Sequence, residues 1–208
     1  MGNVGGFAPA GILHEAPGTY RMLFGKRAFF GYVVAPDERV WWFANPPTPY
    51  PEHPDRDWLV ALFTDDAGPA VPLILGTPGD LLFSDQLELP RVPVWRRGPM
   101  IVVGDAAHAA SPTSGQGAAL AAEDGLALAR CLRDLPVSGA LAAFEAQRRA
   151  RVERVVAEAA RTSATKVPGP AARFIRDLIL PIVLAAATRS SRDWLFDYRI
   201  PWEDRVAP

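Results

Sequence analysis

The pattern of apolar and polar positions divides the chain into an N-terminal half of short strands and a C-terminal half of longer helices. Aromatic and β-branched residues dominate segments 20–24, 28–34 and 39–44, and turn-forming residues separate the last two. We therefore predict a β-meander with a hairpin turn at 35–38.

Alternate side chains of a strand share one face of its sheet. Phe30 and Tyr32 therefore lie on one face of their strand, and Trp42 and Ala44 lie on one face of the next strand. This arrangement predicts a broad aromatic wall. The residue types leave two interpretations open, namely the core face of a sheet or the wall of a ligand pocket.

Helical spacing of apolar residues predicts a short helix at 55–63 and longer helices at 117–135, 140–162 and 171–188. On the helix at 140–162, opposite charges at four-residue spacing indicate a solvated face; the pairs are Glu145 with Arg149, Arg149 with Glu153, and Arg154 with Glu158. We therefore do not expect the basic run at 148–154 to form a binding patch.

A continuous apolar run, Met-Ile-Val-Val at 100–103, precedes the glycine-rich segment. A strand without alternation of apolar and polar residues is typically buried on both faces. We expect three regions, a sheet region at 1–99, a strand, loop and helix at 100–135, and a helical region at 136–208.

Composition restricts the class of protein. Of the 208 residues, 49% are hydrophobic and 22% are charged, and the net charge of −1 offers no field for nucleic acid. The single cysteine, Cys131, cannot form an internal disulfide bond, and three scattered histidines do not predict a metal site. We expect a cytoplasmic protein without a signal peptide or transmembrane segment.

The residues with the most specific chemistry lie between the apolar run and the next helix. Asp105 follows the predicted strand, where a carboxylate can accept hydrogen bonds from ligand hydroxyls, and Gly104 permits close approach. Gly115, Gln116 and Gly117 form a turn whose amides lie at the positive end of a helix. A flavin has both a polyol chain and an edge that becomes anionic. Phosphate binding and a purely structural turn are the alternatives, although the usual phosphate-binding glycine motifs are absent.

Two segments resemble a known family. The first is GDAAHAASPTSGQGAALAAEDGLALA, at 104–129, which is similar to the second flavin-binding motif of the FAD-dependent monooxygenases of the aromatic hydroxylase type, the para-hydroxybenzoate hydroxylase-like family. The second is FFGYVVAPDERVWWFANPP, at 29–47, which resembles the substrate-domain sheet of that family. The resemblance covers residues 20–158 and only the C-terminal half of such an enzyme.

The resemblance implies roles for individual residues. Asp105 would bind the ribityl hydroxyls of FAD, Pro112 would lie beside the isoalloxazine, and the turn at 115–117 would contact its pyrimidine edge. His108 would belong to the scaffold near the flavin, with an acid–base role as the alternative. No catalytic side chain is assigned.

The substrate site is also implied by the resemblance. Phe30, Tyr32 and Trp42 are candidates for the pocket wall above the flavin, on a side of the sheet that the sequence does not determine. The family reaction would use NAD(P)H and O2 to hydroxylate or epoxidise an aromatic or olefinic small molecule on FAD.

The expected fold is α+β, with a substrate-domain β-sheet followed by helices, and it would form part of an FAD/NAD(P)-binding α/β fold in the full-length family. The GxGxxG turn that holds the adenosine half of FAD is absent from the sequence. Three hypotheses remain: the C-terminal portion of a monooxygenase, one half of a split flavoprotein with an N-terminal Rossmann partner, or a non-catalytic binding module. We therefore expect the chain alone to bind FAD weakly.

Overall fold

The computed structural model describes residues 2–112, 115–164, 174–175, 178–179, 182 and 193–207. The chain forms two compact units, which are described separately. The first unit contains the strands and helices up to Gln86, and the second begins at Leu87. Both strands and helices are present, as the sequence predicts. The division into regions 1–99, 100–135 and 136–208 stays a prediction.

The first unit contains one antiparallel sheet with the strand order β2-β3-β4-β1-β5. The predicted meander and its hairpin turn are confirmed, because the amide of Ala35 donates to the carbonyl of Arg39 across the turn. The strands are β1 (Gly2–Ala8), β2 (Tyr20–Phe24), β3 (Phe29–Val34), β4 (Val40–Asn45) and β5 (Ser84–Asp85).

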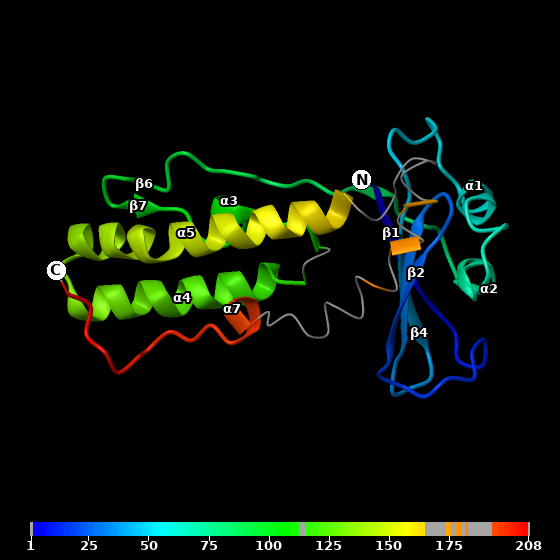
Figure 1. The fold of residues 1–208 in the computed structure, drawn as a ribbon, viewed down its shortest axis with the longest axis horizontal. Coiled ribbons are helices and arrows are strands. Elements are labelled where there is room, and N and C mark those ends of the chain that lie inside the picture. Colours follow the sequence, from blue (N-terminus) through cyan, green and yellow to red (C-terminus); the bar gives the residue numbers. More distant parts are fainter. Residues whose placement is uncertain are drawn as a thin grey trace. The chain divides into compact units, whose positions relative to one another are not determined.

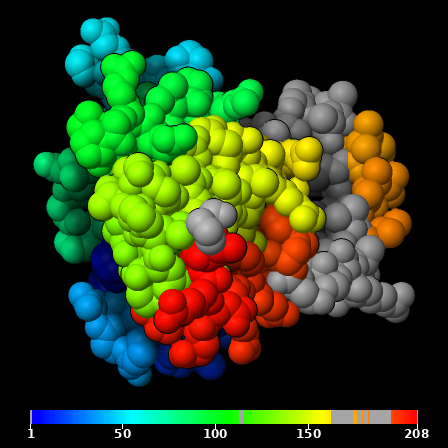
Figure 2. Space-filling view, turned by 90° about the vertical axis from the view of Figure 1, so that its left-hand side faces the viewer, coloured from blue at the N-terminus to red at the C-terminus, as the bar shows by residue number. Residues whose placement is uncertain are grey.

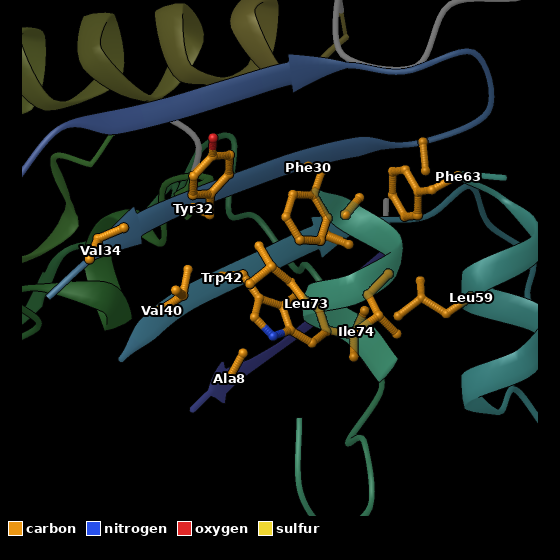
Figure 3. Close-up of a cluster of buried hydrophobic side chains, with 14 residues drawn as sticks. Ala8, Phe30, Tyr32, Val34, Val40, Trp42, Leu59, Phe63, Leu73 and Ile74 are labelled. Carbon is orange, nitrogen blue, oxygen red and sulfur yellow. The ribbon is translucent and has the colours of Figure 1, made fainter. Parts of the chain in front are cut away.

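Two short helices, α1 (Arg56–Ala61) and α2 (Ala70–Gly76), contribute to the core on one face of this sheet (Figure 3). Phe30 stacks on Trp42 with ring centroids 5.4 Å apart, and it forms a T-shaped pair with Phe63 at the same centroid distance. The Trp42 indole N–H donates to the hydroxyl of Thr77 over 2.7 Å. This side of the aromatic wall is therefore the core of the first unit.

Strand β1 is a feature that the sequence analysis missed. Its glycines lower strand propensity, which conceals the pattern. They are required by packing, because a Cβ at Gly6 would lie 2.7 Å from the Thr77 methyl carbon, and one at Gly5 would lie 2.9 Å from the Trp42 carbonyl oxygen. The glycines thus allow β1 to lie close against the core.

The second unit is mainly helical (Figure 1). Helices α4 and α5, both of which the sequence predicts, run side by side, and the C-terminal segment (red) lies against α5 (yellow-green) in Figure 2. The elements are β6 (Arg96–Arg97), β7 (Met100–Ile101), α3 (Asp105–His108), α4 (Gly117–Asp134), α5 (Val137–Ala164) and α7 (Asp193–Phe196).

The prediction that segment 100–103 is a strand buried on both faces is wrong for the described chain. The strand β7 ends at Ile101, and among the described residues it pairs only with β6. Met100 is 66% exposed and Val103 is 39% exposed, because no described element covers them. Most of the predicted helix at 171–188 lies outside the described residues. No described helix has both the length and the apolar character needed to span a bilayer.

Candidate functional site

A tight turn at Gly104 connects the apolar segment to α3. Gly104 is buried and has φ 58° and ψ −141°, a conformation that favours glycine. Its carbonyl accepts hydrogen bonds from the amides of Ala107 (2.9 Å) and His108 (3.0 Å). Asp105 begins α3, and its side chain is exposed. The turn therefore presents a carboxylate to the surface from a backbone held in a fixed shape.

The second predicted feature is the glycine turn at the start of α4. The Gly115 amide donates to the carbonyl of Pro112 over 3.0 Å, and Gly115 has a positive φ of 62°. Apart from its chain neighbours and the helix backbone, a Cβ built at Gly115 or at Gly117 would have no described atom within 4 Å. A ligand therefore has direct access to the backbone at both positions. The first amides of α4 have no partners inside the helix, so they give this end a partial positive charge.

The structure brings these two features to the same end of α4. A Cβ built at Gly104 would lie 3.5 Å from the Cβ of Ala121, which is one turn beyond Gly117. An exposed carboxylate, open glycine backbone and a helix N-terminus thus belong to one region of the second unit. This combination suits a ligand that has hydroxyl groups and a developing negative charge.

A buried carboxylate ties this region to both long helices. Asp124 on α4 is 0% exposed, and its Oδ2 accepts the Gly104 amide over 3.0 Å. The same oxygen lies 2.6 Å from Nε2 of His108. Oδ1 of Asp124 accepts a hydrogen bond from Nε of Arg148 on α5 over 2.8 Å. Asp124 therefore connects the turn, α3 and α5.

Glu123 extends the cluster. It forms ion pairs with Arg148 (2.7 Å) and Arg151 (2.8 Å), and Arg151 also donates to the backbone carbonyl of Trp194 in α7. The two carboxylates and two guanidinium groups balance in charge, which is required for groups removed from water.

The electrostatics favour the ionised forms. Burial would raise the pKa of Asp124, but hydrogen bonds from His108, the Gly104 amide and Arg148 outweigh it and lower that pKa. Burial would likewise raise the pKa of Glu123, but its hydrogen bonds with Arg151 and Arg148 outweigh that effect and lower the Glu123 pKa. The pKa of Arg148 is raised, because its carboxylate partners outweigh the effect of burial. The cluster is therefore an ionic connection between α4 and α5.

Sequence analysis missed this cluster. The expectation that the charges of α5 form a solvated face is wrong for Arg148, which is 0% exposed. Phe144, Arg148 and Val152 share a face at four-residue spacing, so the sequence did contain a signal that Arg148 faces the core. The predicted pairs of Arg149 with Glu145 and Glu153 are confirmed.

The structure places the remaining candidate residues as follows. His108 is 1% exposed and bonded to Asp124, which supports a scaffold role over an acid–base role. Phe30, Tyr32 and Trp42 lie in the core of the first unit, and the Tyr32 hydroxyl donates to Glu15 over 2.8 Å. Their contact with a substrate stays a prediction. Among the described residues, no group of three or more His, Cys, Asp or Glu side chains is placed to hold a metal ion.

Comparison with known proteins gives this geometry a context. Residues 90–159, which contain the Gly104 turn, the glycine turn and the charge cluster, match a family described as an FAD binding domain. The chain is a relative of the FAD-dependent monooxygenases of the aromatic hydroxylase type. The family resemblance that the sequence predicts is therefore confirmed.

Two curated relatives illustrate the similarity. The aurachin C monooxygenase/isomerase of Stigmatella aurantiaca is 36% identical over 140 residues, which are 64% of this chain and 36% of the relative. The FAD-dependent urate hydroxylase of Mycolicibacterium vanbaalenii is 33% identical over 143 residues, 65% of this chain and 35% of the relative. The chain thus matches about a third of the length of each of these two relatives.

Solved structures show the same fold. HpxO of Klebsiella pneumoniae, complexed with FAD and uric acid, is 26% identical with a TM-score of 0.70 over 92% of this chain and 49% of HpxO. A salicylate hydroxylase substrate complex is 19% identical with a TM-score of 0.75 over 95% of this chain and 54% of that protein. FAD is therefore confirmed as the cofactor of this family.

Proposed function

We propose that this chain supplies the isoalloxazine- and ribityl-binding part of an FAD-dependent monooxygenase. The observation that carries the proposal is the position of exposed Asp105, directly after the fixed Gly104 turn and at the same end of α4 as the open glycine backbone. The match of residues 90–159 to an FAD binding domain supports it.

The residues present fit a flavin. The carboxylate of Asp105 accepts hydrogen bonds from ribityl hydroxyls, since an ionised carboxylate is an acceptor with two oxygens. The backbone of the turn at Gly115, Gln116 and Gly117 would contact the pyrimidine edge, and the positive end of α4 would stabilise negative charge there. The Gly115 amide itself donates to the carbonyl of Pro112, so it helps to hold the turn in shape. Pro112, which begins this turn, borders the ring. When bound, FAD supplies the redox chemistry, and the protein supplies orientation and electrostatics.

The test is flavin retention by an Asp105 variant. The chain is incubated with FAD, passed through gel filtration, and read by visible absorption, and the affinity is measured by titration of flavin fluorescence. Asp105→Ala is expected to weaken flavin binding by about tenfold or more, because a charge-assisted acceptor is lost. Asp80→Ala, which removes an exposed carboxylate in the first unit, is the matched control. Equal flavin binding by Asp105→Ala and the wild-type chain would contradict the proposal.

The proposed reaction uses NAD(P)H and O2 to hydroxylate or epoxidise an aromatic or olefinic small molecule. Monooxygenases among the relatives support this reaction class and do not favour a non-catalytic remnant. We propose that the substrate contacts the aromatic sheet of the first unit. Phe30, Tyr32 and Trp42 are the candidates from the sequence, but exposed fractions favour the opposite face, where Tyr20 is 43% and Trp41 is 37% exposed.

The two faces of the sheet are distinguished by neighbouring tryptophans. In the flavin-loaded, complete enzyme, Trp41→Leu is expected to raise KM for the aromatic substrate with little change in stability. Trp42→Leu is expected to lower the unfolding free energy by about 2–5 kcal/mol, because it leaves a cavity and removes the partner of Thr77. An unchanged KM for Trp41→Leu, combined with a raised KM for Trp42→Leu, would contradict this assignment and would indicate that the substrate binds at the face of Phe30.

We also propose that a dinucleotide-binding half, in the same longer protein or on a separate chain, binds the adenosine portion of FAD. The absence of a GxGxxG turn from the sequence supports this proposal, as do the exposed apolar residues Met100 and Val103. For a half on a separate chain, co-purification with this chain is the expected result, and in either case tight stoichiometric binding of FAD by this chain alone would contradict the proposal.

We also propose that the protein is cytoplasmic. Its single cysteine, Cys131, is buried and free, which is typical of proteins in a reducing compartment.

A further inference from the structure

We propose that Asp124 is a positioning residue that holds the Gly104–Asp105 turn in the shape required to meet the ligand. The inference rests on the proposed function for the identity of the ligand, but the positioning itself concerns only this chain. Asp124 is 20 residues from Gly104 in the sequence and accepts its amide N–H in the buried interior.

The geometry makes this hydrogen bond the anchor of the turn. The carbonyl of Gly104 accepts the amides of Ala107 and His108, so the C-terminal side of the peptide is fixed by α3. The amide of Gly104 is fixed from the other side by Oδ2 of Asp124. Gly104 is thus held at both its donor and its acceptor, immediately before the exposed carboxylate of Asp105.

The Asp124 carboxylate is itself held in a single orientation. Its Oδ1 is engaged by Arg148 from α5, whereas its Oδ2 receives both the Gly104 amide and Nε2 of His108. Each carboxylate oxygen therefore has its own partners, and a rotation of the group would break hydrogen bonds on both sides. The low pKa of Asp124 is consistent with an ionised acceptor at neutral pH.

An amide in place of this carboxylate cannot satisfy both sides. In Asp124→Asn, one oxygen becomes an NH2 donor, and the cation of Arg148 competes for the remaining oxygen. The Gly104 amide then faces a donor instead of an acceptor. The turn is expected to open locally, even where α4 and α5 stay folded.

The test is site-resolved hydrogen exchange of the full 208-residue chain, with the Cys131 amide in the interior of α4 as the reference for global opening. Asp124→Asn is expected to accelerate exchange at Gly104 by about tenfold or more relative to Cys131. Val152→Ala, a change on α5 in the apolar core whose side chain takes no part in the hydrogen bonds of Gly104 and Asp124, is the control. It is expected to accelerate both amides by the same factor.

A second variant is provided in case Asp124→Asn fails to fold. Asp124→Ala combined with Arg148→Met removes the acceptor and its buried cation together, so no charge is left without its partner at these two positions. Its expected result is the same selective acceleration at Gly104. Gly104 exchange that rises only in proportion to Cys131 in the folded variant would overturn the proposal.

Riboflavin binding provides the second readout. Asp124→Asn is expected to weaken riboflavin binding by about tenfold, equivalent to about 1.4 kcal/mol, while Val152→Ala leaves it within about twofold. Undiminished riboflavin binding by Asp124→Asn would overturn the link between positioning and ligand. If the wild-type chain binds no flavin but Gly104 still exchanges selectively faster in Asp124→Asn, positioning by Asp124 is supported and the proposed function fails.

Discussion

At the scale of single residues, the candidate site depends on the contrast between Gly104 and Asp105. Gly104 is buried, and its backbone donor and acceptor are both engaged within the second unit. The Asp105 side chain next to it is exposed. A carboxylate held at the surface by a fixed backbone is suited to bind a ligand, because little conformational freedom of the backbone is lost on binding.

The conformation of Gly104 leads to a prediction about stability. Gly104→Ala is expected to lower the unfolding free energy by about 1–3 kcal/mol, because a side chain is strained at its positive φ even though the nearest atom is 3.5 Å away. Gly125→Ala is the matched control, since Gly125 lies in the interior of α4 and no described atom beyond the helix backbone lies within 4 Å of an added Cβ.

Chemical denaturation measures both variants. Gly125→Ala is expected to raise stability by about 0.5–1 kcal/mol, because alanine is the better helix former. A Gly104→Ala variant as stable as the wild-type chain would show that the turn does not require a positive φ.

At the scale of the elements, α4 and α5 are connected by an ionic cluster within an otherwise apolar interface. The sequence predicts both helices within three residues at each end, because their apolar periodicity is strong. It did not predict which charges turn inward. The four-residue spacing on α5 correctly predicts the ion pairs of Arg149 with Glu145 and Glu153, but the Arg149 and Glu145 side chains are only 22% and 23% exposed. The apolar spacing places Arg148 on the core face of α5, but its partners lie on α4, and partners on another helix leave no local spacing signal.

The cluster predicts unequal effects of two arginine substitutions on α5. Arg148→Met is expected to lower the unfolding free energy by about 3–5 kcal/mol, because buried Asp124 loses its cation. Arg161→Met is expected to change it by less than about 1 kcal/mol, because Arg161 is 78% exposed in its pair with Glu158. Thermal or urea unfolding measures the difference. Similar small effects for both variants would mean that the cluster contributes little to the packing of α4 against α5.

At the scale of the whole molecule, the sequence predicted the sheet-and-helix content and the meander but missed strand β1. Propensity is a local quantity, whereas the glycines of β1 are explained by contacts with Trp42 and Thr77 far along the chain. For β1 the sequence analysis missed a strand, whereas for the segment at 100–103 it predicted burial that the structure does not show. Its composition predicts burial on both faces, whereas Met100 and Val103 are exposed among the described residues, consistent with the proposed dinucleotide-binding half.

The candidate site was also predicted only in part from the sequence. Asp105 and the glycine turn at 115–117 were identified from a compact motif. Asp124 belongs to the same motif, but its role depends on Gly104 and on Arg148 from the next helix. Contacts between distant segments are set by tertiary packing, so they became visible only in the folded chain.

The central claim is that this chain holds the flavin and ribityl portion of FAD without an adenosine site. The most direct measurement is competition against bound FAD, followed by flavin fluorescence, with riboflavin and ADP as the competitors. The account predicts that riboflavin displaces FAD with an affinity within about tenfold of that of FAD, and that ADP displaces none. Displacement of FAD by ADP but not by riboflavin would contradict it.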